Sequence, residues 1–155
     1  MNKLFQLVVF NLDNQKYALH LSIVETVVRV VEFTPLPQAP KIVNGIVNFH
    51  GKIIPVFNIR KRFNLPDKET NLNDHLIIAH TSKRMAALIV DSVSHIISKS
   101  EEEIIDAAKI LPEIKYVEGI LKLKDGMILI HNLDEFLSLE EEKELENSLK
   151  GDIKV

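Results

Sequence analysis

Short apolar runs of strand length, rich in valine and isoleucine, fill the first two-thirds of the chain and alternate with polar turn residues. Leu4–Leu12 is apolar on both faces at its centre, a pattern typical of a strand that is buried on both sides. After a turn at 13–15, apolar residues alternate in Tyr17–Leu21. These two segments therefore predict a β-hairpin.

Two signals compete in the next segment. Ser22–Glu25 has the spacing of a helix capping box, but five of the six residues in 26–31 are β-branched. Such side chains are stiff and favour a pleated surface, so we expect a turn followed by a strand. Three prolines then make 33–40 an extended connection.

Strand-length runs continue to residue 130 and come in pairs around short turns. They predict strands at 42–49, 52–59, 75–80, 85–90, 91–98, 116–123 and 127–130. We expect a loop at 64–74 and an irregular segment with room for a short helix at 100–114. From Asn132 the apolar residues take helical spacing among many glutamates, which predicts a C-terminal helix that could break near Ser138 and fray at its end.

One segment occurs twice. KIVNGIVNFHGKIIPVFNIRKRF at 41–63 aligns without a gap with KYVEGILKLKDGMILIHNLDEFL at 115–137. Gly45 and Gly119 occupy matching positions, and both copies have a strand–turn–strand pattern. The matching glycines predict a bend or a close approach of two strands, and the repeat indicates a duplication that produces two similar β units.

Each unit is built from short strands, which avoid exposed edges by closing into a small barrel. The pattern therefore predicts a mostly β protein with two barrels packed side by side. A groove between such subdomains is a common place for a ligand or a partner segment.

Composition narrows the classes of function. The 155 residues are 46% hydrophobic and 26% charged, with a net charge of −3, so no global basic field favours nucleic acid or an anionic membrane. The chain has no cysteine, which excludes disulfides, thiol nucleophiles and cysteine-ligated zinc. The N-terminal apolar run is too short for a signal peptide and no run is long enough for a membrane helix, so a cytoplasmic protein is expected.

The ordered segments resemble the CheW-type chemotaxis adaptors over nearly the whole chain. The resemblance rests on QLVVFNLDNQKYAL, FTPLPQAPKIVNGIVNFHGKIIPVFNIRKRF, ALIVDSVSHII and GILKLKDGMILIHNLDEFL, which occur in that order and at suitable separations. Each segment is weak alone, and together they are specific.

This resemblance implies two SH3-like, five-stranded β-barrel subdomains packed side by side, followed by a short C-terminal helix. We expect one CheW-like domain over residues 1–150. Its intertwined subdomains would cover about 14–80 and 81–137, the N-terminal strand could be shared, and 138–155 would form the helix and a frayed tail.

The resemblance also implies a function without catalysis: no enzyme activity, no catalytic or metal site and no cofactor. The expected partners are the regulatory domain of the histidine kinase CheA and the cytoplasmic tip of methyl-accepting chemoreceptors, with no nucleic acid and no direct membrane insertion. The protein would lie in the cytoplasm at membrane-associated receptor arrays.

Two groups of residues are the expected partner contacts by this resemblance. One group would line or border the groove that takes the receptor tip: Val24, Glu25, Thr26, Val27, Val28, Val90, Ser92 and Val93. The other lies at a predicted turn: Asn48, His50 and Gly51. A helix that docks in a groove needs an apolar floor and a polar rim, and the valines could equally be ordinary core residues.

The chain departs from the family pattern at three positions. His50 stands where an arginine is usual, Asn58 where an aspartate is usual, and Thr26 where a glutamate is often found, with Glu25 as its alternative. Neutral histidine cannot replace a bidentate guanidinium. These changes leave open a divergent chemosensory pathway, such as twitching motility.

Other functions leave weaker signals. The six histidines show no metal-binding spacing on a helix, which argues against a metal-dependent hydrolase. Arg60–Arg62 could contact nucleic acid, but few aromatic residues flank it for base stacking. A solvated basic face, or contact with acidic residues of a partner, is the expected role of this run.

Overall fold

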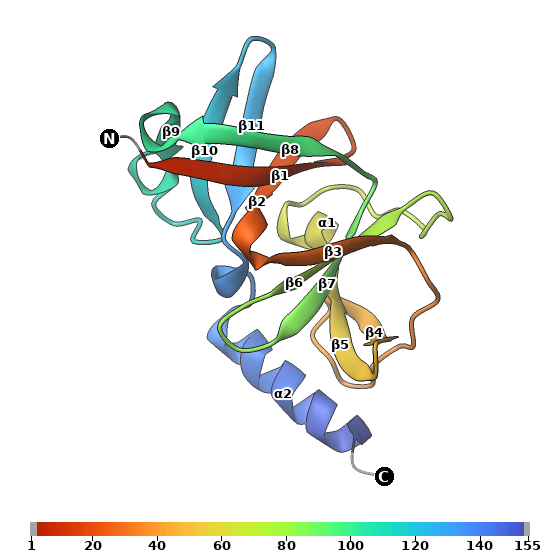
Figure 1. The fold of residues 1–155 in the computed structure, drawn as a ribbon. Coiled ribbons are helices and arrows are strands. Elements are labelled where there is room, and N and C mark those ends of the chain that lie inside the picture. Colours follow the sequence, from red (N-terminus) through yellow and green to blue (C-terminus); the bar gives the residue numbers. More distant parts are fainter. Residues whose placement is uncertain (1–2, 154–155) are drawn as a thin grey trace.

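Two β-sheets and a C-terminal helix make up the computed structural model, which describes residues 3–153 (Figure 1). Sheet A has the strand order β8-β1-β2-β11-β10-β9, with β1 Leu4–Leu12, β2 Gln15–His20, β8 Ser92–Ser100, β9 Ile104–Asp106, β10 Val117–Leu123 and β11 Gly126–His131. Sheet B has the order β3-β6-β7-β5-β4, with β3 Val24–Arg29, β4 Val43–Phe49, β5 Lys52–Phe57, β6 His75–His80 and β7 Met85–Val90. The predicted mostly β, two-barrel fold class is confirmed, and sheet A has a short sixth strand, β9.

Helical segments join and follow the strands. The α-helices are α1 Ile59–Arg62 and α2 Leu139–Ile153, and the 3-10 turns are η1 Leu21–Ile23, η2 Glu101–Glu103, η3 Ala107–Lys109 and η4 Leu133–Glu135. The predicted break near Ser138 is confirmed, because η4 ends at Glu135 and α2 begins only at Leu139. Ser138 caps the start of α2: its Oγ accepts a hydrogen bond from the Glu141 amide, and the Glu141 carboxylate accepts one from the Ser138 amide. The predicted frayed end falls partly on residues 154–155, which lie outside the described residues.

The predicted strand at 52–59 is too long. It ends at Phe57, because the Asn58 side chain accepts a hydrogen bond from the Lys61 amide and begins α1. The strand predicted at 42–49 is β4, which begins one residue later at Val43. The 3-10 turn η1 leads into β3, which starts at Val24, so a turn followed by a strand forms as the β-branched run indicated.

The two copies of the repeat have the same strand register. Val43 pairs with Phe57 in the β4–β5 hairpin, and Val117 pairs with His131 in the β10–β11 hairpin, at a constant offset of 74 residues. Each hairpin has its register shift directly after this first pair. Figure 1 shows the two hairpins projecting at opposite ends of the molecule. The duplication read from the sequence is therefore matched in the fold.

The N-terminal hairpin completes the second copy. Sheet B is built from the contiguous strands β3 to β7, whereas sheet A combines β8 to β11 with β1 and β2. The strands β5 and β11 have equivalent parallel partners, β7 and β2. Sheet membership thus differs from the expected ranges 14–80 and 81–137, since β2 lies in sheet A and β7 in sheet B. The single domain over 1–150 stays a prediction.

Gly45 and Gly119 permit a close approach at equivalent places. A Cβ atom on Gly45 would collide with the carbonyl oxygen of Thr34, which bridges to Ile46. A Cβ atom on Gly119 would lie 2.6 Å from Cγ2 of Ile104, in β9. Both glycines therefore allow a neighbouring segment to cross the hairpin.

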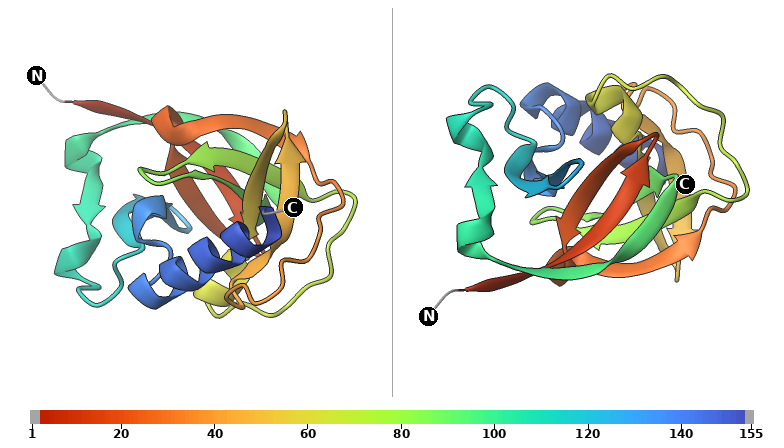
Figure 2. Two further views of the ribbon diagram at one scale, coloured as in Figure 1. Left: turned by 90° about the horizontal axis from the view of Figure 1, so that it is seen from below. Right: turned by 90° about the horizontal axis from the view of Figure 1, so that it is seen from above.

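The sheets share their largest apolar core. Alternate residues of β1 serve two clusters: Leu7 and Val9 pack inside sheet A, whereas Phe10 and Leu12 join a cluster with residues of sheet B. Strands β2, β6 and β7 also contribute to the shared cluster, and Leu145 of α2 closes it from the side. Side chains thus fill the centre of the predicted groove. The views in Figure 2 show α2 along the outside of the molecule.

Gly45→Ala should lower the free energy of unfolding by about 2–3 kcal/mol, because the added methyl group meets backbone that moves only with its strand. Gly119→Ala should cost less, since a side chain is the nearest obstacle. Urea denaturation followed by circular dichroism measures both, with exposed Ser98→Ala as control. Equal losses in the two glycine variants would contradict this account of the crossings.

Candidate protein-binding surfaces

The edge strand β3 carries the first predicted group. It pairs antiparallel with β6, with Val27 opposite Ile77 and Val28 opposite Leu76. Val24 and Val27 are partly exposed and pack on the shared core, whereas Val28 packs on the core of sheet B. The strand therefore has valines on both faces, and the register decides which of them border the junction between the sheets.

Two polar members of this group have defined positions. Glu25 is exposed, and its carboxylate lies 3.1 Å from Nδ1 of His80 at the end of β6. Thr26 lies opposite Ile78 after a register shift, and it is partly exposed. Glu25 thus supplies an accessible carboxylate beside the position where the family pattern has one.

The crossover from sheet B to sheet A carries Val90, Ser92 and Val93. Val90 is 0% exposed in the shared core, so it cannot touch a partner and is a packing residue. Val93 is partly exposed and packs on that same core, as Val24 and Val27 do. Ser92 is held by the side chain of Asn11, which donates a 2.9 Å hydrogen bond to its hydroxyl.

The second predicted group forms the tip of the β4–β5 hairpin. His50 and Gly51 have φ angles of 49° and 85°, which fit a two-residue turn of the type that matches strand twist. Asn48 Oδ1 accepts a 2.9 Å hydrogen bond from the Gly51 amide and rigidifies the turn. The exposed His50 ring packs against Phe49 with centroids 4.3 Å apart. All three predicted residues are exposed, together with Ile53.

Arg60 ties the two sheets together and was not predicted to do so. Its Nη1 lies 2.8 Å from the carboxylate of Asp13 in the β1–β2 turn, and its Nη2 lies 2.7 Å from Asp91 at the crossover. Its side chain is only 9% exposed. Lys68 adds pairs to Asp91 and to the buried Asp74. The expectation that the basic run is a solvated face is therefore wrong for Arg60.

The network shifts the pKa of its acid. Burial by itself would raise the pKa of Asp91, but hydrogen bonds from Arg60 and from the Asp13 amide hold this pKa below its ordinary value. The carboxylate therefore stays charged in the folded protein. Asp13 and Asp91 each directly follow the last residue of a predicted strand, and this placement at strand ends is the one signal that could have suggested the pairing.

Asn58 keeps one property of the usual aspartate. Its side-chain oxygen still caps α1, at 3.4 Å from the Lys61 amide, and its amide group donates to Asn44. The cap therefore places Arg60 for its pairs with no negative charge at position 58.

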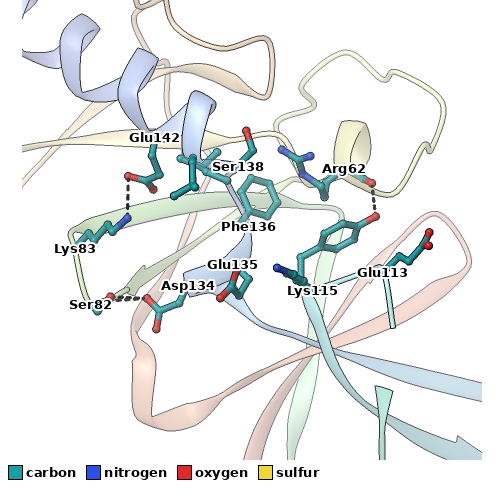
Figure 3. Close-up of a pocket in the computed structure, with 13 residues that line it drawn as sticks. Arg62, Ser82, Lys83, Glu113, Lys115, Asp134, Glu135, Phe136, Ser138 and Glu142 are labelled. Carbon is teal, nitrogen blue, oxygen red and sulfur yellow. Dashed lines mark hydrogen bonds and ion pairs between the residues drawn. The ribbon is translucent and has the colours of Figure 1, made fainter. Parts of the chain in front are cut away.

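A pocket of about 560 Å³ opens where the β6–β7 turn, the segment before β10 and the start of α2 meet (Figure 3). The Ser82 amide donates a 2.8 Å hydrogen bond to Asp134, and Lys83 approaches Glu142. Phe136 lies between these groups and Arg62. Both signs of charge line the pocket, so it offers no concentrated positive charge for an anion, and none of the predicted contact residues line it.

His131 is a core residue. It occupies the position equivalent to Phe57, lies 1% exposed among Phe63, Tyr116 and Phe136, and neither ring nitrogen has a hydrogen-bond partner. Burial, with a smaller contribution from Arg62, lowers the pKa of His131 to about 3. The imidazole is therefore neutral and serves as an aromatic packing group.

The remaining histidine contacts bear on the alternative of a metal-dependent hydrolase. His20 pairs with Glu118 and His80 with Glu25, and within residues 3–153 no three His, Asp or Glu side chains gather as metal ligands would. No helix in that range has the length and apolar character needed to cross a membrane.

Comparison with known proteins identifies relatives of the whole fold. The family model of the CheW-like domain matches residues 6–141. The chain is 27% identical over 149 residues to the chemotaxis protein CheW of Treponema pallidum, covering 92% of this chain and 88% of that one. It is 26% identical over 138 residues to CheW of Rhizobium meliloti, covering 88% and 89%. The crystal structure of the scaffolding protein TtCheW from Thermoanaerobacter tengcongensis superposes with a TM-score of 0.78 at 33% identity, covering 91% of this chain and 96% of that one.

Asp91→Asn should make the protein less stable than wild type at pH 7, by about 1–3 kcal/mol. The pKa of Asp91 is lowered by folding, so its ion pairs stabilise fully above the ordinary carboxyl pKa of about 3.9, and that stability is lost as the pH falls through the folded value. The two proteins should therefore converge in acid. Urea midpoints from pH 7 to pH 3 measure this, with exposed Asp125→Asn as control. A constant difference across the range would show that the charge of Asp91 is not responsible.

Proposed function

Because this chain belongs to the CheW family, we propose that it is a non-enzymatic chemotaxis adaptor that couples methyl-accepting chemoreceptors to the histidine kinase CheA. Coupling would occur through protein–protein contacts. One partner would be the regulatory domain of the kinase, and the other the cytoplasmic tip of the receptors. The protein would act in the cytoplasm, at membrane-associated receptor arrays.

The observation that carries this proposal is a pair of separate surfaces on one frame. The tip of the β4–β5 hairpin presents Asn48, His50 and Gly51, whereas Val24 and Val27 of β3 lie at the junction of the sheets. The shared core and the Arg60 pairs connect the two sheets. An adaptor needs such a frame, since it transmits the position of one partner to the other by geometry.

Each surface suits one partner. The hairpin tip is a rigid polar turn with exposed Ile53 beside it, and a similarly folded kinase domain could pack against such a tip. Val24, Val27 and Val93 are partly exposed above the shared core, which suits the apolar face of a receptor helix, and Glu25 supplies a polar rim. Val90 supports this surface from inside.

The structure argues against a nucleic-acid-binding module more than against an adaptor of a divergent pathway. Arg60 and Arg62 use their guanidinium groups in internal pairs with Asp13, Asp91 and Glu141, so two of the three residues of the basic run are not free to follow a phosphate backbone. This disfavours the small-barrel nucleic-acid module. An adaptor of a divergent chemosensory pathway is the nearer alternative, because exposed His50 would alter contacts at the hairpin tip.

The full chain should bind both a CheA regulatory domain and a receptor-tip fragment in titrations, with micromolar affinities typical of modest interfaces. Val27→Glu should weaken receptor binding about tenfold or more and leave kinase binding intact, because it puts charge on the proposed helix surface. Val31→Glu is the control, since Val31 is exposed but lies outside β3. Failure to bind either fragment, or equal loss of both in Val27→Glu, would argue against the proposal.

His50→Arg should raise the affinity for a typical CheA regulatory domain, by about three- to tenfold, because a guanidinium can form paired hydrogen bonds that imidazole cannot. Binding of the receptor tip should not change. His95→Arg, at an exposed position on β8, is the matched control. Unchanged or weaker kinase binding in His50→Arg would count against a contact role for the hairpin tip.

A further inference from the structure

The helix α2 makes few apolar contacts with the rest of the protein. Among its described side chains, Leu145 is fully buried and Leu149 is partly buried, whereas Leu139 is 81% exposed. A helix that is held by burial normally presents an apolar stripe along its length. Another interaction must therefore contribute to its docking.

Carboxylates of α2 supply that interaction. Glu141 lies 2.5 Å from Arg62 of α1, and Glu142 lies 2.7 Å from Arg84 in the β6–β7 turn. Arg84 also approaches Glu146 at 3.7 Å. The side chains of Arg84 and Glu142 are 14% and 15% exposed, so this pair is only weakly screened by solvent.

The pairs are incompletely satisfied. Nε of Arg62 and one carboxylate oxygen of Glu142 are buried without a hydrogen-bond partner. Burying charge opposes docking unless every polar atom finds a partner, so the net stabilisation from these ion pairs is smaller than their short distances suggest. The ion pairs therefore fix how α2 is oriented against α1 and the β6–β7 turn, a docking site that we call its seat, but they add only modestly to the free energy of docking.

The start of α2 is also stabilised locally. Its first turn has its own capping box, in which Ser138 and Glu141 exchange hydrogen bonds of 3.1 and 2.8 Å. The strands of sheets A and B have their ladders and two further apolar clusters without α2. The link between η4 and α2 is short and has Ser138 exposed at its end.

We propose that α2 is an electrostatically held cap that leaves its seat while both sheets stay folded. Its start forms one wall of the pocket at the sheet junction, through Ser138, Leu139 and Glu142. Release removes that wall and uncovers the shared core beside Leu145. This surface lies apart from both proposed partner contacts, because none of their residues line the pocket.

Hydrogen exchange of the full chain, read by mass spectrometry, tests this proposal. Amides of residues 142–150 should exchange faster than those of β6 in wild type. In Arg84→Gln they should exchange about tenfold faster still, with β6 changing much less, because the variant removes two contacts of the cap. Lys143→Gln makes the same charge change at an exposed position on α2 and should leave exchange unaltered.

A second measurement covers the case in which Arg84→Gln does not fold. In wild type, amides of α2 should reach full exchange before those of β1 or β6, because α2 opens without the strands. Because the chain has no cysteine, Leu145→Cys and Leu88→Cys also give separate thiol-labelling rates for the cap and for the core. The proposal is overturned if α2 and the strands exchange and label together in all conditions, since α2 would then open only by global unfolding.

Discussion

The contact between the two sheets is the constraint on which the rest of the structure depends. Each sheet has strands with apolar residues on both faces. The side chains on the face toward the other sheet meet in a shared core. That core resists separation but has little directional preference. Arg60 adds direction, because its guanidinium joins the β1–β2 turn to the crossover through charged hydrogen bonds. An adaptor that transmits position depends on both contributions.

Local patterns in the sequence predicted the elements well. The run Leu4–Leu12 became β1 with the same bounds, and β6 and β7 also match their predicted ranges. The gapless repeat also predicted how strands pair, since the hairpins of both copies share one register and one bulge position. These features depend on side-chain alternation and turn chemistry, which neighbouring residues specify.

Non-local contacts account for what the sequence did not reveal. Three basic residues in a row have the same pattern whether they face water or, as Arg60 and Arg62 do, carboxylates far along the chain. Val90 belongs to an apolar run, and only the packing of two sheets shows that it is buried. The gapless repeat aligns His131 with Phe57, but histidine is usually read as polar, so the alignment did not predict an aromatic core residue there. The candidate contact surfaces came from the family resemblance, and the structure separates their exposed members from their supports.

Sheet A combines the N-terminal hairpin β1–β2 with strands from the end of the chain, and this has a consequence for biosynthesis. Sheet B can be completed as soon as β7 has left the ribosome, but the hairpin made first must wait for β8 and β11 to cover its two edges. During that interval a nascent chain exposes unpaired strand edges that could join those of a neighbour. At least one edge of this hairpin therefore stays unpaired throughout the translation of residues 21–131.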